Sequence, residues 1–247
     1  MARVNEHAEY VDKHIPLNYK RLFTVLVGSQ NYGLSDENSD VDTYSFVIPE
    51  LEPMMFDNGS STLFSLGEEY ATVYDFRVFG DLKRISSFSF LEVLFSDYVN
   101  VTSRGENLYN YLRSLREDIA RYDTRRTALS MCGAFKQLGD IIARGDDKSS
   151  KKLAQAYRIR LTLSSYCKGF SFERSLNQSF YRTEYFNLKK WKEVDRFVPL
   201  YNGLSELVDN IYTFWRNQIG LTNKALEIEI RDKLARIYYN YINLTSH

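Results

Sequence analysis

Two carboxylates, Asp40 and Asp42, stand one residue apart at the start of an apolar segment, residues 41–48. The β-branched and aromatic residues of this segment are typical of a β-strand, which Pro49 should stop. Side chains two residues apart in a strand point to the same face, so both carboxylates should project together. A hard divalent cation with oxygen ligands, such as Mg²⁺, relieves the repulsion between them. The spacing therefore predicts a magnesium site.

A glycine–serine turn lies upstream of this pair. Residues 21–27 (RLFTVLV) predict a buried strand, and Gly28 and Ser29 follow it directly. Glycine lets a ligand approach the backbone closely, and serine adds a hydroxyl group and an N–H group. These groups suit the phosphates of a nucleotide that is bound to the same metal ion.

A third acid, Asp75, falls within an apolar pattern, residues 69–76 (EYATVYDF), which predicts another strand. An acid is unusual in such a place. Three carboxylates on adjacent strands could hold two Mg²⁺ ions about 3.5–4 Å apart, an arrangement used for in-line displacement at phosphorus. Asp75 would then contact the metal ion that activates the attacking oxygen, and it could accept the proton. Asp81 in this role, or a solvent-facing Asp75, is the alternative.

These segments define the expected architecture. Residues 1–120 combine a short helix at 6–19, three strands and later helical pieces at 77–86, 89–97 and 104–119, with an irregular stretch at 49–62. The remainder is almost wholly helical, with helices expected at 124–144, 149–168, 203–219 and 222–243. We expect an α+β fold with a catalytic domain at 1–120 and a helical, substrate-binding domain at 121–247.

The formal net charge of zero hides a gradient along the chain. Residues 1–120 carry 10 Lys and Arg against 19 Asp and Glu, whereas residues 121–200 carry 17 against 8. An acidic part could hold cations, and a basic part could receive an anionic partner. Lys152 and Arg158 fall in the helix expected at 149–168. They would bind the triphosphate or a nucleic-acid backbone, or else belong to a solvated helix surface.

The combined pattern resembles a known superfamily. GSQNYGLSDENSDVD, then VYDFRVFGDLKRISSFSFLEVLFSD and KKLAQAYRIRL, are similar to segments of the DNA polymerase β-like nucleotidyltransferases. The likeness is greatest to a bacterial and phage family of predicted nucleotidyltransferases, some of which are associated with RNA-repair genes. The resemblance covers about residues 21–100, with a weaker match at 151–161. It implies a polymerase β-like domain, two Mg²⁺ ions and an NTP substrate. The implied site residues are Asp40, Asp42 and Asp75 as metal ligands, and Gly28 and Ser29 at the phosphates with help from Ser39.

The chain departs from that family at two places, and these leave the acceptor open. Gln30 stands where a histidine often follows Gly-Ser, and Thr43-Tyr44-Ser45 stands where a basic residue is expected. An RNA 3′ end, such as a damaged or processed tRNA, is the acceptor that the basic segment favours. A hydroxyl of a protein or small molecule is the second candidate. A non-catalytic protein that binds nucleotide or RNA is the third, although it would not need three mutually repelling acids.

The composition of the chain excludes several other classes of protein. The longest apolar runs are far shorter than the roughly 20 residues of a membrane helix, and the N-terminus lacks a signal-peptide pattern. Cys132 and Cys167 are too few for a disulfide framework and should be buried and inert, and the three histidines show no metal-ligand spacing. We therefore expect a cytoplasmic protein without a membrane partner or a zinc site.

Overall fold

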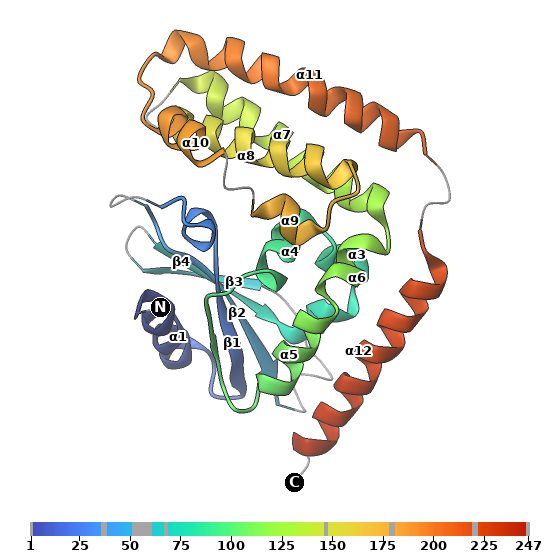
Figure 1. Ribbon diagram of the computed structural model, residues 1–247. Helices are drawn as coiled ribbons and strands as arrows, with labels where there is room; N and C mark the ends of the chain where they lie inside the picture. Colours follow the sequence, from blue (N-terminus) through green and yellow to red (C-terminus); the bar gives the residue numbers. More distant parts are fainter. Residues whose placement is uncertain are drawn as a thin grey trace. The chain divides into compact units, whose positions relative to one another are not determined.

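The computed structural model describes residues 2–35, 39–50, 61–66, 69–145, 148–177, 181–218 and 222–245. The chain forms two compact units (Figure 1). The first unit comprises Met1–Ile85, Ser89–Ile119 and Lys224–His247. The second unit comprises Ser86–Phe88 and Ala120–Asn223. Among the residues so described, no helix has the length and apolar character needed to cross a membrane.

A five-stranded mixed sheet forms the centre of the first unit, with the strand order β3-β4-β2-β1-β5. Strands β2 and β4 run parallel, and the other neighbouring pairs run antiparallel. The strands are β1 (Tyr19–Val27), β2 (Asp42–Pro49), β3 (Ser61–Leu66), β4 (Glu69–Asp75) and β5 (Val99–Val101). Every residue of β1 from Arg21 to Val27 is buried, which explains its largely apolar sequence: the sheet is covered on both faces.

Helix α1 (Ala2–His14) covers one face of the sheet. Its Val11 packs with Val47 of β2 and with Ala71 and Val73 of β4. The helix ends before Pro16, because proline lacks the N–H group that a continuing helix requires. Odd-numbered residues of β2 and β4 therefore face α1.

Aromatic side chains fill the other face of the sheet. The ring centroids of Phe23 and Phe46 lie 4.8 Å apart, and Phe79 lies 4.8 Å from Phe46. Tyr109 adds a further ring 5.2 Å from Phe23. The remaining elements of this unit are η1 (Ser29–Tyr32), η2 (Phe76–Gly80), α3 (Leu82–Ile85), α4 (Phe88–Leu94), α5 (Glu106–Ser114), α6 (Arg116–Arg121) and α12 (Lys224–Thr245). The first residue of α4 and the last two residues of α6 belong to the second unit.

The second unit is helical. Its elements are α7 (Thr124–Arg144), α8 (Ser149–Cys167), α9 (Phe172–Leu176), α10 (Arg182–Lys189), η4 (Val194–Arg196) and α11 (Phe197–Arg216). Helices α7, α8 and α11 pack against one another, and Met131, Phe135, Leu163 and Val208 are fully buried in this unit.

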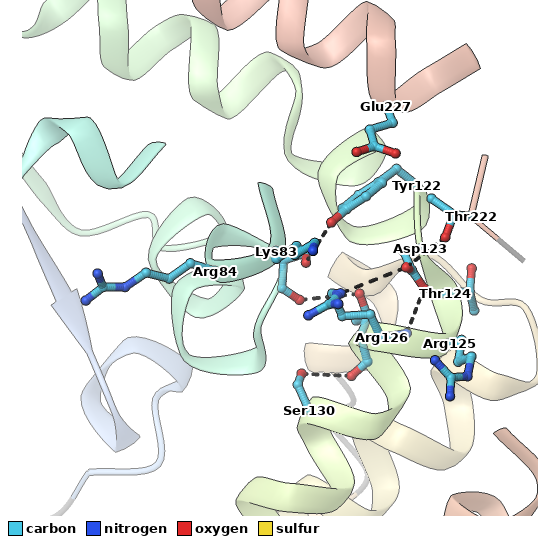
Figure 2. Close-up of polar contacts among 12 residues, drawn as sticks. Lys83, Arg84, Tyr122, Asp123, Thr124, Arg125, Arg126, Ser130, Thr222 and Glu227 are labelled. Carbon is cyan, nitrogen blue, oxygen red and sulfur yellow. Dashed lines mark hydrogen bonds and ion pairs between the residues drawn. The ribbon is translucent and has the colours of Figure 1, made fainter. Parts of the chain in front are cut away.

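A polar group around Asp123 fixes the start of α7 (Figure 2). The Asp123 carboxylate accepts a hydrogen bond from the Arg126 backbone N–H at 2.9 Å, which is the geometry of a helix N-cap. Its other oxygen accepts the Thr222 hydroxyl at 3.0 Å. Thr222 also forms a β-bridge with Asp123, so the segment that follows α11 is held at the start of α7.

The mixed α+β class agrees with the prediction, and several elements differ from it. The short strands β3 and β5 and the helices α9 and α10 were not expected. Helix α11 begins at Phe197 rather than at 203, because Pro199 falls in its first turn, where proline is tolerated. The units divide between residues 119 and 120, but Lys224–His247 belongs to the first unit rather than to the helical one. Of the expected irregular stretch, residues 51–60 lie outside the described residues.

Candidate functional site

The turn after β1 begins with a backbone conformation that only glycine adopts readily. Gly28 has φ 76° and ψ −158°. The short helix η1 follows, and Gly33, with φ 63°, closes it. The Asn31 N–H group donates to the Gly28 carbonyl oxygen at 3.2 Å, and the Leu34 N–H group donates to that of Ser29 at 3.0 Å. The turn is therefore tight and internally hydrogen-bonded.

The side chain of Gln30 joins this turn to the segment that enters β2. Its amide nitrogen donates to the carbonyl oxygen of Ser39 at 3.1 Å and to that of Asp40 at 3.3 Å. Ser39 is buried and Asp40 is half-buried. The glutamine that departs from the family pattern thus has a structural role, because it holds the acidic segment beside Gly28 and Ser29.

Asp42 is the first residue of β2, and it lies next to Gly28. It pairs with Val27 of β1 on one side and with Tyr70 of β4 on the other. Its Oδ2 atom is 3.6 Å from the position that a Cβ atom would take on Gly28. A Cβ atom on Gly28 would be in ordinary van der Waals contact with this carboxylate, so the backbone of the turn lies directly beside it. Asp40 precedes the strand, so regular strand geometry does not fix its direction relative to Asp42.

The structure does not bring Asp75 to these two acids, contrary to the sequence expectation. Asp75 pairs with Val47, which lies five residues beyond Asp42 in β2. At about 3.3 Å per residue, the two acids are separated by roughly 16 Å along the strands. Asp75 also follows Val73 by two residues, and so faces α1 rather than the side of Asp42. The alternating pattern of the strand indicated that Asp75 is buried. It could not predict the register in which β4 pairs with β2.

Asp75 has a structural environment of its own. It is 6% exposed, and it accepts the backbone N–H group of Arg77 at 2.8 Å as the N-cap of η2. The Arg77 guanidinium donates to both carboxylate oxygens, at 2.9 Å and 2.6 Å. This paired, capped acid is not part of the site proposed below.

Lys152 and Arg158 both lie on α8, in the second unit. The Lys152 ammonium group donates to the Gln155 side chain at 3.3 Å. Arg158 is 3% exposed, and its guanidinium carbon lies 5.6 Å from the centroid of the Phe88 ring. Their expected contact with a triphosphate or a nucleic-acid backbone stays a prediction.

Another acid, which the sequence interpretation missed, lies near Tyr44 of β2. Glu92 on α4 is 8% exposed, although α4 is otherwise almost wholly apolar. Burial raises the pKa of the Tyr44 phenol well above its usual range, and the charges of Tyr74, Glu92 and Asp42 raise it further. Glu92 and Asp42 therefore both act on Tyr44, which stays a neutral phenol. A single acid within FSFLEVL was the signal that could have indicated Glu92.

The donor set fits a hard cation only in part. Mg²⁺ in proteins is usually bound through one or two carboxylates, with water and substrate phosphates completing its octahedron. Asp42 supplies one such carboxylate beside the Gly28 turn, and Asp40 precedes it by two residues in the sequence. Within the described part of the chain, no group of three or more His, Cys, Asp or Glu residues is arranged to hold a metal ion. Substrate oxygens would have to supply the remaining ligands.

Comparison with known proteins adds little. No protein-family model and no curated protein matches the chain. Among solved structures, a nucleotidyltransferase-like protein from Exiguobacterium sibiricum 255-15 is similar over 98% of this chain and 90% of its own, with 14% sequence identity and a TM-score of 0.34. At that identity and TM-score the likeness carries no argument about function.

Proposed function

We propose that the protein transfers a nucleoside monophosphate from an NTP to an acceptor hydroxyl group, with release of pyrophosphate. The observation that carries this proposal is that Gly28 lies beside the Asp42 carboxylate in a conformation that favours glycine. A Cβ atom built on Gly28 would lie 3.6 Å from Asp42 Oδ2. A glycine turn that could receive phosphate thus adjoins an oxygen ligand for the cation that would accompany the phosphate. The Gly-Ser…Ser-Asp-x-Asp pattern, which resembles polymerase β-like nucleotidyltransferases, supports the same assignment.

The residues of this turn would bind and orient the triphosphate. The N–H groups of Gly28 and Ser29 and the Ser29 hydroxyl group are the donors for its oxygens. Ser39 is buried, so its contribution is to the shape of the segment that Gln30 holds. Asp40 and Asp42 would hold Mg²⁺, which when bound neutralises charge on the phosphates.

The reaction itself is a displacement at the α-phosphorus. The acceptor oxygen forms a bond to the α-phosphorus, the bond from phosphorus to the bridging oxygen of pyrophosphate breaks, and the hydroxyl proton passes to water. The protein contributes positioning and electrostatic stabilisation rather than a covalent intermediate. The site needs no side-chain nucleophile for this chemistry.

An RNA 3′ end is the acceptor that we propose. Residues 121–200 carry 17 Lys and Arg against 8 Asp and Glu, an excess suited to a polyanion. The neutral charge of the whole chain does not oppose this assignment, because the acids are concentrated in residues 1–120.

Labelling of acceptors tests both parts of the proposal. The protein is incubated with each α-³²P-labelled NTP, Mg²⁺, and either total RNA or an RNase-treated lysate, and the labelled fraction is identified. We expect label in RNA, and its loss in Asp40→Asn and Asp42→Asn. Asp232→Asn, at an exposed position of α12, is the matched control and should label as the wild type does.

Three results would contradict the proposal in whole or in part. Label that persists in both Asp40→Asn and Asp42→Asn would show that the site is elsewhere. Label that appears in protein or small molecules, but not in RNA, would retain nucleotidyl transfer and overturn the RNA acceptor. No label in any fraction, with any NTP, would contradict the activity itself.

A further inference from the structure

Tyr70, the second residue of β4, lies directly opposite Asp42 in the parallel pairing of β4 with β2. Neighbouring strands are about 4.8 Å apart, and residues that pair across them project from the same face of the sheet. Tyr70 is 44% exposed. Among the described residues, no ring stacks on it and no group forms a hydrogen bond with its hydroxyl group. An available aromatic ring therefore stands one strand away from the proposed metal ligand.

The sheet face that carries Asp42 and Tyr70 becomes more exposed toward the start of both strands. Tyr74, four residues further along β4, packs against other rings, and its ring centroid lies 5.2 Å from that of Phe90. At the start of the strands, Asp42 is half-buried and Tyr70 is exposed. On the α1 side of the sheet, by contrast, Ala71 is fully buried. A ligand can therefore reach Asp42 and Tyr70 from the same face.

Polar contacts on the opposite face hold the backbone of this pair. Glu69, which precedes Tyr70, has its Oε2 atom 3.0 Å from Nε2 of His7 on α1. The Nδ1 atom of the same ring lies 3.0 Å from Oγ1 of Thr43, the residue that follows Asp42. His7 is 1% exposed, so water does not compete for these contacts. The exposed ring and the carboxylate are thus carried by two strand ends that one buried side chain joins.

The reaction that we propose assigns each substrate to one side of Asp42. Val27, the residue before Gly28, pairs with Asp42 from β1, and Tyr70 pairs with it from β4. In a displacement at phosphorus, the incoming and leaving oxygens lie roughly in line on opposite sides of the phosphorus atom. With the pyrophosphate part of the NTP at the Gly28 turn, the incoming oxygen of the acceptor lies on the side of β4.

We propose that the Tyr70 ring stacks on the 3′-terminal base of a single-stranded RNA acceptor and so positions its hydroxyl group near Asp42. This inference rests on the proposed nucleotidyl transfer, because that reaction assigns the side of β4 to the acceptor. Aromatic side chains hold single-stranded nucleic acid by stacking, which tolerates any base because every base has a π-face. An acceptor without a flat ring would gain nothing from Tyr70.

The charge of the first 120 residues favours an uncharged contact of this kind. They carry 10 Lys and Arg against 19 Asp and Glu, so this part of the chain has few cations to offer a phosphate. Stacking needs no cation. A ring at Tyr70 can therefore hold the end of the RNA in acidic surroundings, while the basic residues of 121–200 remain available to phosphates further along the strand.

A fluorescent base at the end of the RNA tests this proposal apart from transfer. The base analogue 2-aminopurine loses fluorescence when it stacks, and it is placed at the 3′ or the 5′ end of a single-stranded RNA oligonucleotide, without NTP. We expect the wild type and Y70F to quench the 3′ label and not the 5′ label. Y70A and Y70L should not quench it, since neither side chain has a π-face. Y239A removes a 68%-exposed tyrosine from α12 and is the matched control, which should behave as the wild type.

Affinity and its salt dependence separate stacking from a contact to phosphate. Anisotropy of the same oligonucleotide, labelled with a dye at its 5′ end, should show that Y70A raises Kd about tenfold, as expected for loss of one stacked base. The slope of log K against log salt should not change, whereas loss of a phosphate contact on a single strand would reduce it by about 0.7. In the transfer assay, Y70A should raise KM for the RNA about tenfold and leave KM for the NTP within about twofold.

The outcomes separate this inference from the proposed function. Quenching of the 3′ label that persists in Y70A, or that is lost equally in Y239A, overturns the role of Tyr70 even if the enzyme transfers nucleotides. Failure of the wild type to bind the oligonucleotide also overturns it. A higher KM for the NTP rather than for the RNA would assign Tyr70 to the base of the nucleotide and contradict the acceptor site. Quenching that depends on Tyr70, in a protein that transfers no nucleotide, supports the stacking site and contradicts the proposed activity alone.

Discussion

The Oδ2 atom of Asp42 lies 3.6 Å from the point at which a Cβ atom would stand on Gly28. The two residues are also coupled through the backbone, because Val27, which precedes Gly28, pairs with Asp42 across β1 and β2. A change in the turn is thus transmitted to the carboxylate. The proposed phosphate-binding turn and the proposed metal ligand therefore act as one structural feature, and alteration of either should impair the other.

Gly28→Ala should reduce both stability and activity. Alanine at φ 76° and ψ −158° occupies a region that is essentially restricted to glycine, at a cost of about 1–3 kcal/mol. If the backbone relaxes to avoid this cost, the turn moves away from Asp42, and transfer should fall at least tenfold. Gly133→Ala is the control. No atom lies within 4 Å of its added Cβ, and in the middle of α7 alanine should stabilise by about 0.5–1 kcal/mol. Urea unfolding and initial transfer rates give both quantities, and wild-type behaviour of Gly28→Ala would contradict the assignment.

Asp75→Asn should damage stability rather than chemistry. The substitution removes the charge of a 6%-exposed carboxylate that accepts three hydrogen bonds from Arg77, so we expect a loss of about 3 kcal/mol. Asp97→Asn breaks an exposed pair with Arg113 and should cost less than about 1 kcal/mol. Transfer per folded molecule should stay within about threefold of the wild type in both. A folded Asp75→Asn protein without activity would restore Asp75 as a ligand.

The contrast between Asp42 and Asp75 shows what the sequence could and could not reveal. Helix α7 could be predicted at 124–144, because Asp123 caps its first turn and Gly145, in a left-handed conformation, ends it. Such signals are local. The alternation within β4 likewise indicated a buried Asp75, but the pairing of Asp75 with Val47 depends on residues far apart in the sequence.

The same limit applies to Glu92 beside the site and to other elements of the fold. Glu92 lies on α4, and its relation to Tyr44 depends on how that helix packs on the sheet. Helix α12 follows the second unit in the sequence, yet it belongs to the first. Strand β5, Val99–Val101, is too short to give a period-two pattern. The motif therefore predicted the Gly28–Asp42 pair, and only the packing identified its neighbours.

Glu92→Gln should lower activity without lowering stability. The side chain keeps its size, but it loses a buried charge that acts on Tyr44 together with Asp42. Transfer should fall about tenfold at saturating Mg²⁺. The free energy of unfolding should stay equal or rise, because a neutral amide is less costly to bury than a carboxylate. Glu106→Gln, exposed at the start of α5, should change neither quantity. Equal activity of Glu92→Gln and the wild type would show that Glu92 is structural only.

Cys132 should make the protein less stable at alkaline pH. Burial, and then the neighbouring Cys167, raise the pKa of the Cys132 thiol to about 12. In the unfolded chain this thiol has its ordinary pKa near 8.5. The native state thus retains a proton that the unfolded state loses as the pH rises above about 9. The free energy of unfolding should fall by about 1.4 kcal/mol per pH unit from this group until the pH reaches its folded pKa.

Cys132→Ala isolates this contribution, since the tyrosines titrate alike in both proteins. At pH 8 the variant should be less stable by about 1 kcal/mol, because it loses a fully buried sulfur atom that lies 3.8 Å from the Val208 carbonyl oxygen. As the pH rises to 10.5, the wild type should lose stability faster than the variant, and the difference should vanish or reverse. Urea unfolding at pH 8, 9, 10 and 10.5 measures it. A difference that stays constant over this range would show that the buried thiol ionises as readily in the native protein as in the unfolded chain.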